Sequence, residues 1–301
     1  MKEDRKKFEL TKNYLRQVYM QNIKLIALDL DGTLFNHQSV ITKQNIDTIN
    51  LAIEQGVTVV ISTGRPFSGL PLEQLSQTNI QYAITTNGSA IYEIPSKKLI
   101  YEDCMDNSVT IPIIDFLMTK HIHMDAFIEG NGYSPIKCLE TAQKLKVPES
   151  LKHYIINTRT RVESLVDFIT QNQLQIQKMT LNFATAKDGT LIDRNEVHSF
   201  LLNNPNVTVV CGGYNNLEFT KAGVDKGVGL YHLAQYLQIP IEETMAIGDT
   251  ENDLAILKAA HIGVAMSNAT SEVKAEADYI TLSNEESGVA AAIRHFLKFP
   301  N

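Results

Sequence analysis

Two aspartates, Asp29 and Asp31, follow the apolar run 25–28 and precede Gly32 and Thr33. A short, continuous apolar run is typical of a parallel strand that is buried on both faces. Open α/β sheets bind ligands at the carboxyl ends of such strands. Two like charges there repel each other, so a bound cation or a shared proton would offset them. The pair predicts a chemical site, with a solvated turn as the alternative.

A hydroxyl and a glycine end the next apolar run, 57–61. Thr63 and Gly64 stand in the sequence Ser62-Thr-Gly-Arg-Pro66. Hydroxyl groups and exposed backbone N–H groups at a strand-to-helix turn bind phosphate oxygens well. Taken alone, this segment is also compatible with a simple turn before a helix.

Two further segments near the carboxyl end carry charged side chains. Lys226 precedes an apolar helix, where a lysine opposes the helix dipole and an anionic partner would explain it, although a solvated surface lysine is the alternative. Asp249, Asn252 and Asp253 follow the apolar run 245–247, and we expect Asn252 or Asp253 to cap the next helix. Four such segments would rarely occur together by chance, so together they favour a single phosphate site.

Strand-like and helix-like segments alternate at both ends of the chain. We expect strands over 25–28, 57–61, 81–85, 245–247 and 262–265, and helices over 42–55, 227–237 and 252–260. Thr42 should cap the first helix, and Gly56 should end it. Alternation of this kind implies an α/β fold, a Rossmann-like, doubly wound parallel sheet with helices on both faces.

The region 105–218 breaks this alternation. Its strand-like runs are 154–156 and 179–183, and its helical patterns lie near 108–120, 162–172 and 190–203. We expect an inserted α+β cap domain here, with the core formed by residues 20–104 and 219–301. Insertions above the carboxyl edge of a sheet commonly act as lids.

The composition is that of an ordinary globular protein. Hydrophobic residues make up 44% of the 301 residues and charged residues 20%, with a net charge of −7 that argues against a general nucleic-acid binder. The three cysteines, Cys104, Cys138 and Cys211, form no metal-binding or disulfide pattern. No apolar stretch is long enough to span a bilayer, so we expect no membrane partner and a cytoplasmic location.

The first nineteen residues are charged and lack the apolar core of a signal peptide. Four residues separate Met20 from the first expected strand, 25–28. We therefore expect residues 1–19 to be an extension that catalysis does not require.

With these motifs in place, the chain resembles a haloacid dehalogenase superfamily phosphatase of the Cof-type group, subclass IIB, with a C2-type α/β cap. The resemblance runs from about Met20 to the carboxyl end. Ser267, where the family usually has glycine, and the extension before Met20 depart from the family pattern. The segments that carry the resemblance are Asp29-Leu-Asp31-Gly-Thr-Leu, Thr63-Gly-Arg-Pro, Thr86-Asn87-Gly88, Lys226-Gly227, and residues 248–253 and 263–269.

The resemblance implies roles for these residues. Asp29 would be the nucleophile, and Asp31 the general acid and base with its side chain free for proton transfer. Mg²⁺ would bind Asp29, the backbone carbonyl of Asp31, and Asp249. The other implied roles are binding of the phosphoryl group by Thr63, Gly64 and Lys226, support of the phosphate or metal site by Asn252, and orientation of Lys226 or a metal-bound water by Asp253.

The implied activity is Mg²⁺-dependent hydrolysis of a small phosphorylated metabolite through an aspartyl-phosphate. Sugar phosphates are the first expectation, and phosphorylated cofactors such as flavin mononucleotide or pyridoxal phosphate come next. A phosphomutase or phosphotransferase acting on sugar phosphates shares this chemistry and stays open, as do a metal-dependent glycosyltransferase and a regulator that only binds its ligand. A monomer or a small homo-oligomer would fit equally well.

Overall fold

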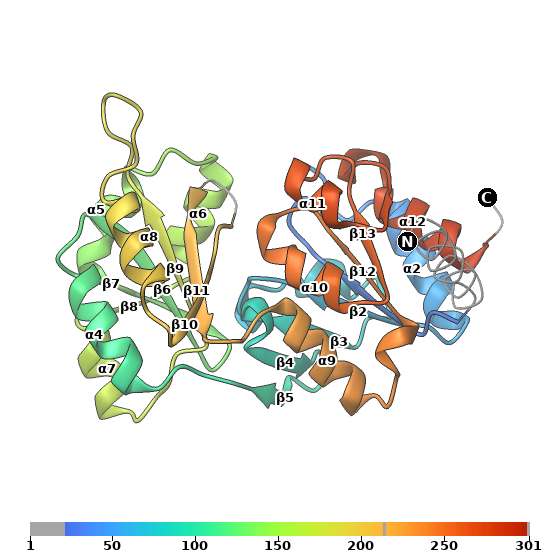
Figure 1. Cartoon of the computed structure of the whole chain (residues 1–301), viewed down its shortest axis with the longest axis horizontal. Helices are drawn as coiled ribbons and strands as arrows, with labels where there is room; N and C mark the ends of the chain where they lie inside the picture. The colour runs from blue at the N-terminus through green and yellow to red at the C-terminus, as the bar shows by residue number, and fades with distance from the viewer. Residues whose placement is uncertain (1–21, 213–214, 300–301) are drawn as a thin grey trace, which may run out of the picture.

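A computed structural model of the chain describes residues 22–212 and 215–299. The expected extension, residues 1–19, lies outside the described residues. The described chain forms two sheets with their helices, which lie next to each other along the longest axis of the molecule (Figure 1). We call the part built on the larger sheet the core and the part built on the smaller sheet the cap.

The core sheet has the strand order β14-β13-β12-β1-β2-β3-β4-β5. The six strands from β14 to β3 are parallel, and the hairpin β4–β5 is antiparallel at one edge. The strands are β1 (Leu25–Leu28), β2 (Thr58–Ser62), β3 (Tyr82–Thr85), β4 (Ala90–Glu93), β5 (Lys98–Glu102), β12 (Thr244–Gly248), β13 (Ile262–Ala265) and β14 (Tyr279–Ile280).

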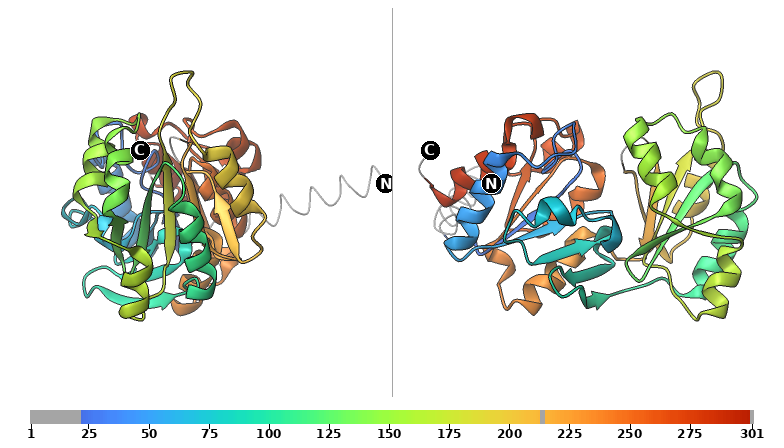
Figure 2. Two further views of the ribbon diagram at one scale, coloured as in Figure 1. Left: turned by 90° about the vertical axis from the view of Figure 1, so that its left-hand side faces the viewer. Right: turned by 180° about the vertical axis from the view of Figure 1, so that it is seen from behind.

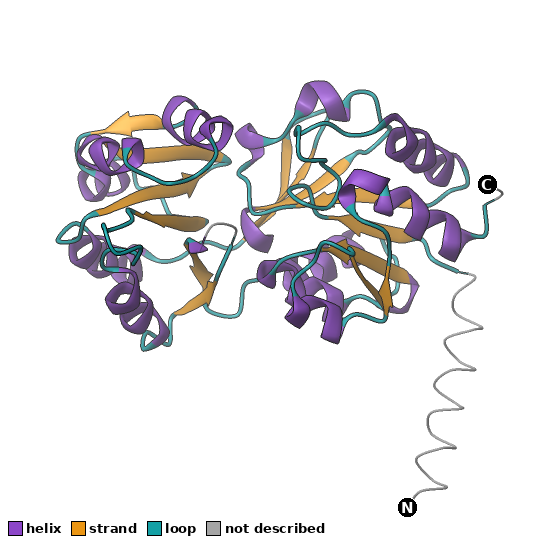
Figure 3. Cartoon of the chain, turned by 90° about the horizontal axis from the view of Figure 1, so that it is seen from above, coloured by secondary structure: helices purple, strands orange, loops and turns teal. Residues whose placement is uncertain are grey.

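Helices cover both faces of the core sheet, as Figure 3 shows from above. Helices α2 and α12 pack against each other, and α10 packs against both α9 and α11. The expected α/β fold with a parallel, doubly wound core is confirmed. The core helices are α2 (Lys43–Glu54), α3 (Leu72–Leu75), α9 (Lys226–Tyr236), α10 (Leu254–Ala259), α11 (Ser271–Glu276) and α12 (Gly288–Leu297), with 3-10 turns η1 (Phe67–Gly69), η2 (Thr86–Gly88), η5 (Ile241–Glu243), η6 (Glu251–Asp253) and η7 (Asn284–Glu286).

The ends of the first core helix follow its sequence closely. The side chain of Thr42 accepts a hydrogen bond from the N–H of Asn45, as expected for the residue that caps α2. Gly56 follows the helix with φ +86°, a conformation that glycine adopts without strain. Both predictions at this helix are confirmed.

The cap sheet has the strand order β10-β11-β9-β6-β7-β8. Its strands are β6 (Ile122–Ile128), β7 (Asn131–Pro135), β8 (Thr160–Val162), β9 (Lys178–Phe183), β10 (Val207–Val210) and β11 (Leu217–Lys221). The β11 residues pair with β10 and β9, so the expected division of the chain at 218 and 219 passes through a strand of this sheet. The boundaries of the cap domain stay a prediction.

The cap helices are α4 (Asn107–Leu117), α5 (Leu139–Gln143), α6 (Glu149–Asn157), α7 (Leu165–Gln171) and α8 (Arg194–Leu202), with a 3-10 turn η3 (Ile136–Cys138). Apolar residues of α4, α7 and α8 pack on one face of the cap sheet. A loop between β9 and α8 projects from the cap, as the view from behind in Figure 2 shows.

One expected strand of the cap is a helix. The run Tyr154–Ile156 lies inside α6, so the prediction of a strand at 154–156 is wrong. Three apolar residues are too few to show a period, and the wider sequence favours a helix, because Pro148 stands at the amino end and Glu149 in the first turn. The run at 179–183 does form a strand, β9.

The two faces of the cap sheet differ in polarity, although the residues on both are buried. Met124, Ala126 and Ile128 of β6 belong to the apolar core of the cap. Side chains alternate along a strand, so His123 and Asp125 lie on the opposite face. In the sheet, Asp125 pairs with Thr180 of β9, and Thr180 pairs with Glu218 of β11. The second face therefore carries a row of polar side chains.

Among the described residues, no helix combines the length and the apolar character needed to cross a membrane.

Candidate active site

Asp29 stands at the carboxyl end of β1, between β12 and β2. Its backbone N–H donates to the carbonyl oxygen of Ile247 at 3.0 Å, which fixes the main chain beyond the strand. The side chain is buried. Because these three strands are parallel, their carboxyl ends bring the residues after β1, β2 and β12 to one edge of the sheet.

Lys226 connects two of the carboxylates at this edge. Its Nζ atom donates to Oδ1 of Asp29 at 2.7 Å and to Oδ1 of Asp253 at 2.6 Å. Lys226 is the first residue of α9, and the side chain of the preceding Asp225 caps that helix by accepting from the N–H of Val228. Lys226 is fully buried, which rules out the alternative of a solvated surface lysine.

Asp253 fixes the lysine and its own loop together. Its Oδ2 atom accepts from the N–H groups of Asp249 at 3.0 Å and Thr250 at 3.1 Å. Asp253 stands at the N-cap position of α10, as expected, but its side chain makes no capping hydrogen bond to that helix. Thr250 caps the preceding 3-10 turn η6. Asp253 instead reaches back to the start of the turn in a capping box.

Asp249 follows β12 and faces the turn after β1. Its Oδ1 atom accepts from the hydroxyl of Thr33 at 2.9 Å. Gly32 has φ +89°, and a Cβ atom added to it would lie 2.3 Å from Oδ2 of Asp249. Two features therefore require glycine at position 32: the positive φ angle, and the carboxylate of Asp249, which leaves no room for a side chain.

Three buried carboxylates, those of Asp29, Asp249 and Asp253, can each place an oxygen atom within 4.8 Å of the others. Both oxygens of Asp253 already accept hydrogen bonds. Within the described part of the chain, Oδ2 of Asp29 and Oδ2 of Asp249 accept none. These two atoms are hard oxygen donors of the kind that Mg²⁺ prefers, so the residues fit a divalent cation.

The electrostatics of the site also favour a cation. Burial, together with the charges of Asp253 and Asp249, raises the pKa of Asp29 well above its usual value, although Lys226 opposes the shift. Burial and the charge of Asp253 raise the pKa of Asp249 to about 7. Burial alone would lower the pKa of Lys226, but the charges of Asp253 and Asp29 raise it, so the lysine stays protonated.

Asp31 is not one of these three clustered carboxylates and pairs instead with Arg65. The guanidinium donates from Nε to one carboxylate oxygen at 2.8 Å and from Nη2 to the other at 2.6 Å, a two-point contact that fixes the plane of the carboxylate. The side chain of Asp31 is 57% exposed. The side chain of Asp31 is thus accessible from solvent, as proton transfer would require, while Arg65 fixes its direction.

Thr63 and Gly64 follow β2 at the same edge. Thr63 is buried, and its carbonyl oxygen accepts from the N–H of Asn87 at 3.1 Å. A Cβ atom on Gly64 would lie 2.9 Å from Oδ1 of Asn87 and 3.0 Å from Nζ of Lys178. Gly64 is thus enclosed by side chains from the core and from the cap.

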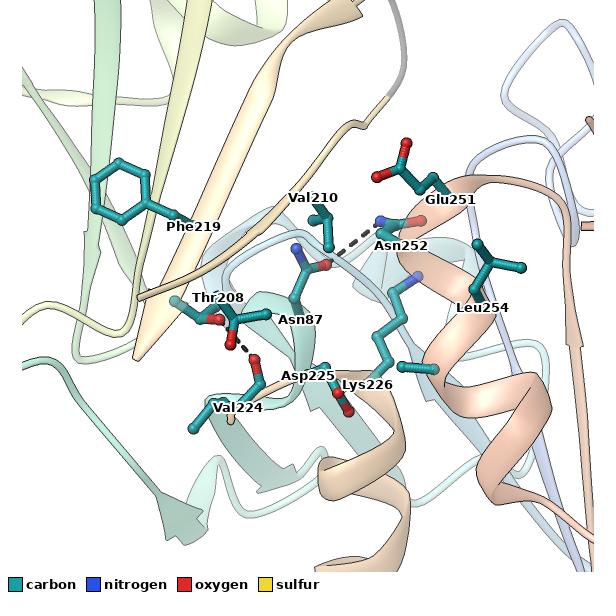
Figure 4. A pocket seen from close by; sticks show the side chains of 12 residues that line it. Asn87, Thr208, Val210, Phe219, Val224, Asp225, Lys226, Glu251, Asn252 and Leu254 are labelled. Carbon is teal, nitrogen blue, oxygen red and sulfur yellow. Dashed lines mark hydrogen bonds between the residues drawn. The ribbon is translucent and has the colours of Figure 1, made fainter. Parts of the chain in front are cut away.

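Asn252 lies beside Asn87 and Lys226 at a cavity of about 210 Å³ between β10 of the cap and α10 of the core (Figure 4). Its Nδ2 atom donates to Oδ1 of Asn87 at 3.4 Å, and its Oδ1 atom accepts from the hydroxyl of Thr250 at 2.8 Å. Asn252 therefore belongs to the same cluster as the predicted phosphate-binding residues.

Two residues at this site were not predicted from the sequence. Lys178 and Glu218 form an ion pair at 2.8 Å, and Asn87 donates to the same carboxylate at 2.7 Å. Both charged residues are buried. The polar residues Lys178, Thr180 and Asn182 alternate with apolar ones along β9, and this alternation is the signal that could have placed them on one face of a strand.

The sequence profile of the haloacid dehalogenase-like hydrolases matches residues 26–293, most of the chain and all the segments of the site. The chain belongs to this family. It is a phosphatase that acts on phosphorylated small molecules, that is, a phosphoric monoester hydrolase. The resemblance stated from the motifs is confirmed.

Individual relatives agree with this assignment over nearly their full length. The chain is 32% identical to the 5-amino-6-(5-phospho-D-ribitylamino)uracil phosphatase YcsE of Bacillus subtilis, covering 92% of this chain and 96% of that protein. It is 33% identical to the putative phosphatase M6_Spy0533 of Streptococcus pyogenes, covering 92% and 99%. Its structure resembles that of the subclass IIB sugar phosphatase BT4131 with a TM-score of 0.76 and 26% identity, covering 91% and 98%.

Proposed function

We propose that this phosphatase hydrolyses phosphate monoesters of small metabolites in a Mg²⁺-dependent reaction that passes through a phosphorylated Asp29. The proposal rests on a buried network of charged side chains, in which Lys226 donates to both Asp29 and Asp253. Asp249 is joined to this network through its backbone N–H, which donates to Asp253. Burying charged groups is costly, so several of them at one sheet edge are best explained by a charged nucleophile and its counter-ions.

In the first step, a carboxylate oxygen of Asp29 attacks the phosphorus atom, and the bond from phosphorus to the leaving oxygen breaks. Asp31 donates a proton to that oxygen, so that an alcohol leaves in place of an alkoxide. Lys226 supplies positive charge next to the attacking carboxylate, and Thr63 with Gly64 offers a hydroxyl and a backbone N–H to the phosphoryl oxygens.

In the second step, Asp31 takes a proton from a water molecule, whose oxygen attacks the phosphorus atom of the acyl phosphate. The bond between phosphorus and Asp29 breaks, which releases inorganic phosphate and restores the carboxylate. The exposure of Asp31 lets it contact both the leaving group and water, while its pairing with Arg65 keeps its direction in both steps.

Asp29 and Asp249 would hold the Mg²⁺ ion, together with the backbone carbonyl of Asp31. When bound, the ion offsets the repulsion between these carboxylates and the phosphate group. Asp253 is engaged by Lys226 and by the backbone, so it supports the site without needing to bind the ion itself. Asn252, which donates to Asn87, would assist the phosphate or metal site.

Sugar phosphates and sugar-alcohol phosphates are the proposed substrates, with flavin mononucleotide and pyridoxal phosphate as the next class. Two relatives support the first class by name, since one is a sugar phosphatase and the other acts on a phosphorylated ribityl compound. The polar face of the cap sheet also supports it, because hydroxyl side chains such as that of Thr180 suit a ligand with many hydroxyl groups.

The test is phosphate release from a panel of sugar, sugar-alcohol and cofactor phosphates, with and without Mg²⁺, using Asp29→Asn as the blank. We expect release only with Mg²⁺ and only from the wild-type protein. Conversion of a sugar phosphate to an isomer without phosphate release would instead indicate a phosphomutase.

A further inference from the structure

Arg65 contacts the cap as well as Asp31. Its guanidinium carbon lies 5.2 Å from the ring centre of Tyr154, which belongs to α6 of the cap. Its Nη1 group donates to the carbonyl oxygen of Gly69 at 3.1 Å, and its guanidinium carbon is 5.4 Å from the ring centre of Phe35. The residue that fixes the predicted acid of the core is therefore in direct contact with an aromatic ring of the cap.

The ring of Tyr154 also contacts a second guanidinium, that of Arg159 in the cap, with the guanidinium carbon 4.8 Å from the ring centre. Arg159 donates from Nε to Asp125 of β6 at 2.9 Å, and its guanidinium carbon is 5.1 Å from the ring of Phe127. Asp125 is fully buried, so Arg159 is anchored to the central part of the cap sheet. Tyr154 thus connects an anchored arginine of the cap to Arg65 of the core.

Gly69 provides the space into which Tyr154 fits. A Cβ atom on Gly69 would lie 2.2 Å from the hydroxyl oxygen of Tyr154, while every other atom would be at least 3.3 Å away. Gly69 does not have a positive φ, so an alanine there would be opposed mainly by this one contact. The end of the tyrosine side chain is therefore seated in the core, directly against the turn η1.

We propose that Tyr154 is a positioning residue, whose seating against Gly69 and Arg65 fixes Arg65 and thereby holds Asp31 in the direction needed for proton transfer. The inference rests on the proposed function, since it assigns Asp31 as the general acid. Arginine has many side-chain conformations, and a fixed aromatic contact reduces them to the one that binds Asp31 at two points. The position of the cap would then determine the orientation of Asp31 through a single residue, Arg65.

The chemistry gives a readout that general damage to the protein would not reproduce. Phenyl phosphate and 4-nitrophenyl phosphate have nearly the same shape, but the 4-nitrophenolate ion is much more stable and leaves without protonation. A variant in which Asp31 is poorly oriented should lose activity mainly on phenyl phosphate. The quantity to compare is kcat/KM, because it covers the steps up to loss of the leaving group and excludes the later hydrolysis of the acyl phosphate.

The experiment measures kcat/KM for both substrates in the wild-type protein, Tyr154→Leu, Tyr154→Phe, Gly69→Ala and the double variant Gly69→Ala with Tyr154→Phe, with thermal unfolding to confirm folding. We expect Tyr154→Leu and Gly69→Ala to lose about tenfold on phenyl phosphate and less than about twofold on 4-nitrophenyl phosphate. Tyr154→Phe keeps the ring and should keep the wild-type ratio between the substrates. The double variant should recover that ratio, because the hydroxyl that meets the new Cβ atom is gone.

Equal losses on both substrates in Tyr154→Leu, or failure of the double variant to recover the ratio, would overturn the inference while leaving the proposed function intact. Should the wild-type protein release phosphate at the same rate as Asp29→Asn, the proposed function itself would fail. The two failures are therefore distinguishable.

Discussion

The Nζ atom of Lys226 lies 2.6 Å from Oδ1 of Asp253, and both side chains are completely buried. The second carboxylate oxygen of Asp253 binds two backbone N–H groups, and the lysine also donates to Asp29. Asp253 therefore determines where the positive charge lies relative to the predicted nucleophile.

Replacing Asp253 by asparagine should disturb both its contacts. The amide offers only one acceptor oxygen, so either Lys226 or the N–H groups of the turn lose their partner. Removing one charged partner of a buried ion pair costs about 3–5 kcal/mol. We expect the free energy of unfolding to fall by an amount in that range. Chemical denaturation measures it.

The control for Asp253→Asn is Asp47→Asn, which breaks the exposed pair of Lys43 and Asp47. Exposed pairs contribute less than about 1 kcal/mol. Equal destabilisation by the two substitutions would contradict the account of Asp253.

Gly32→Ala should weaken the binding of Mg²⁺. The new Cβ atom would meet Oδ2 of Asp249 at 2.3 Å and displace a predicted metal ligand. We expect the concentration of Mg²⁺ needed for half-maximal activity to rise at least about tenfold, which corresponds to about 1.4 kcal/mol of binding free energy. Titration of phosphatase activity with MgCl₂ measures it.

Gly56→Ala is the matched control for Gly32→Ala. Gly56 has φ +86°, close to the +89° of Gly32, but nothing lies within 4 Å of its added Cβ atom. This variant should be destabilised by backbone strain of about 1–2 kcal/mol and keep its Mg²⁺ requirement. If the two variants shifted that requirement equally, strain and not contact with Asp249 would explain the effect.

The stabilisation of the fold by Mg²⁺ should grow as the pH rises through about 7. Burial and the charge of Asp253 raise the pKa of Asp249 to about 7 in the metal-free protein, whereas an unfolded aspartate titrates near 4. Because the pKa is higher in the folded state, Asp249 contributes its full stabilisation of the fold below about pH 4. That stabilisation is lost as the pH rises through about 7. Mg²⁺ binds the ionised carboxylate and so replaces the lost contribution.

The measurement is the gain in Tm on adding saturating Mg²⁺, recorded at about pH 6 and about pH 8. We expect the larger gain at the higher pH. Asp249→Asn has no carboxylate to titrate, so the difference between the two pH values should shrink in this variant. A gain that is the same at both pH values in the wild-type protein would contradict the assignment of Asp249.

The sequence was most informative about the core. Buried parallel strands such as β1 appear as continuous apolar runs, and polar residues such as Asp29 and Asp249 mark their carboxyl ends, so fold class and predicted site residues follow from the same short segments. The strand β13 was predicted with its observed bounds, Ile262–Ala265.

The cap was harder to predict because its strands carry polar residues that are buried by tertiary contacts. In β6 the polar residues His123 and Asp125 interrupt the apolar pattern, yet the whole strand is buried. The contacts of Arg65 with Tyr154 and of Asn87 with Glu218 join segments far apart in the sequence. No local pattern encodes such pairs, since they depend on how the cap and the core come together.

The most direct test of the central claim compares the wild-type protein and Asp29→Asn for release of phosphate from 4-nitrophenyl phosphate in the presence of Mg²⁺. The account predicts that the variant is folded, with a circular dichroism spectrum like that of the wild type, and that its release rate falls to the background of the buffer. Turnover by the folded variant at a rate close to that of the wild type would contradict Asp29 as the nucleophile, and with it the proposed mechanism.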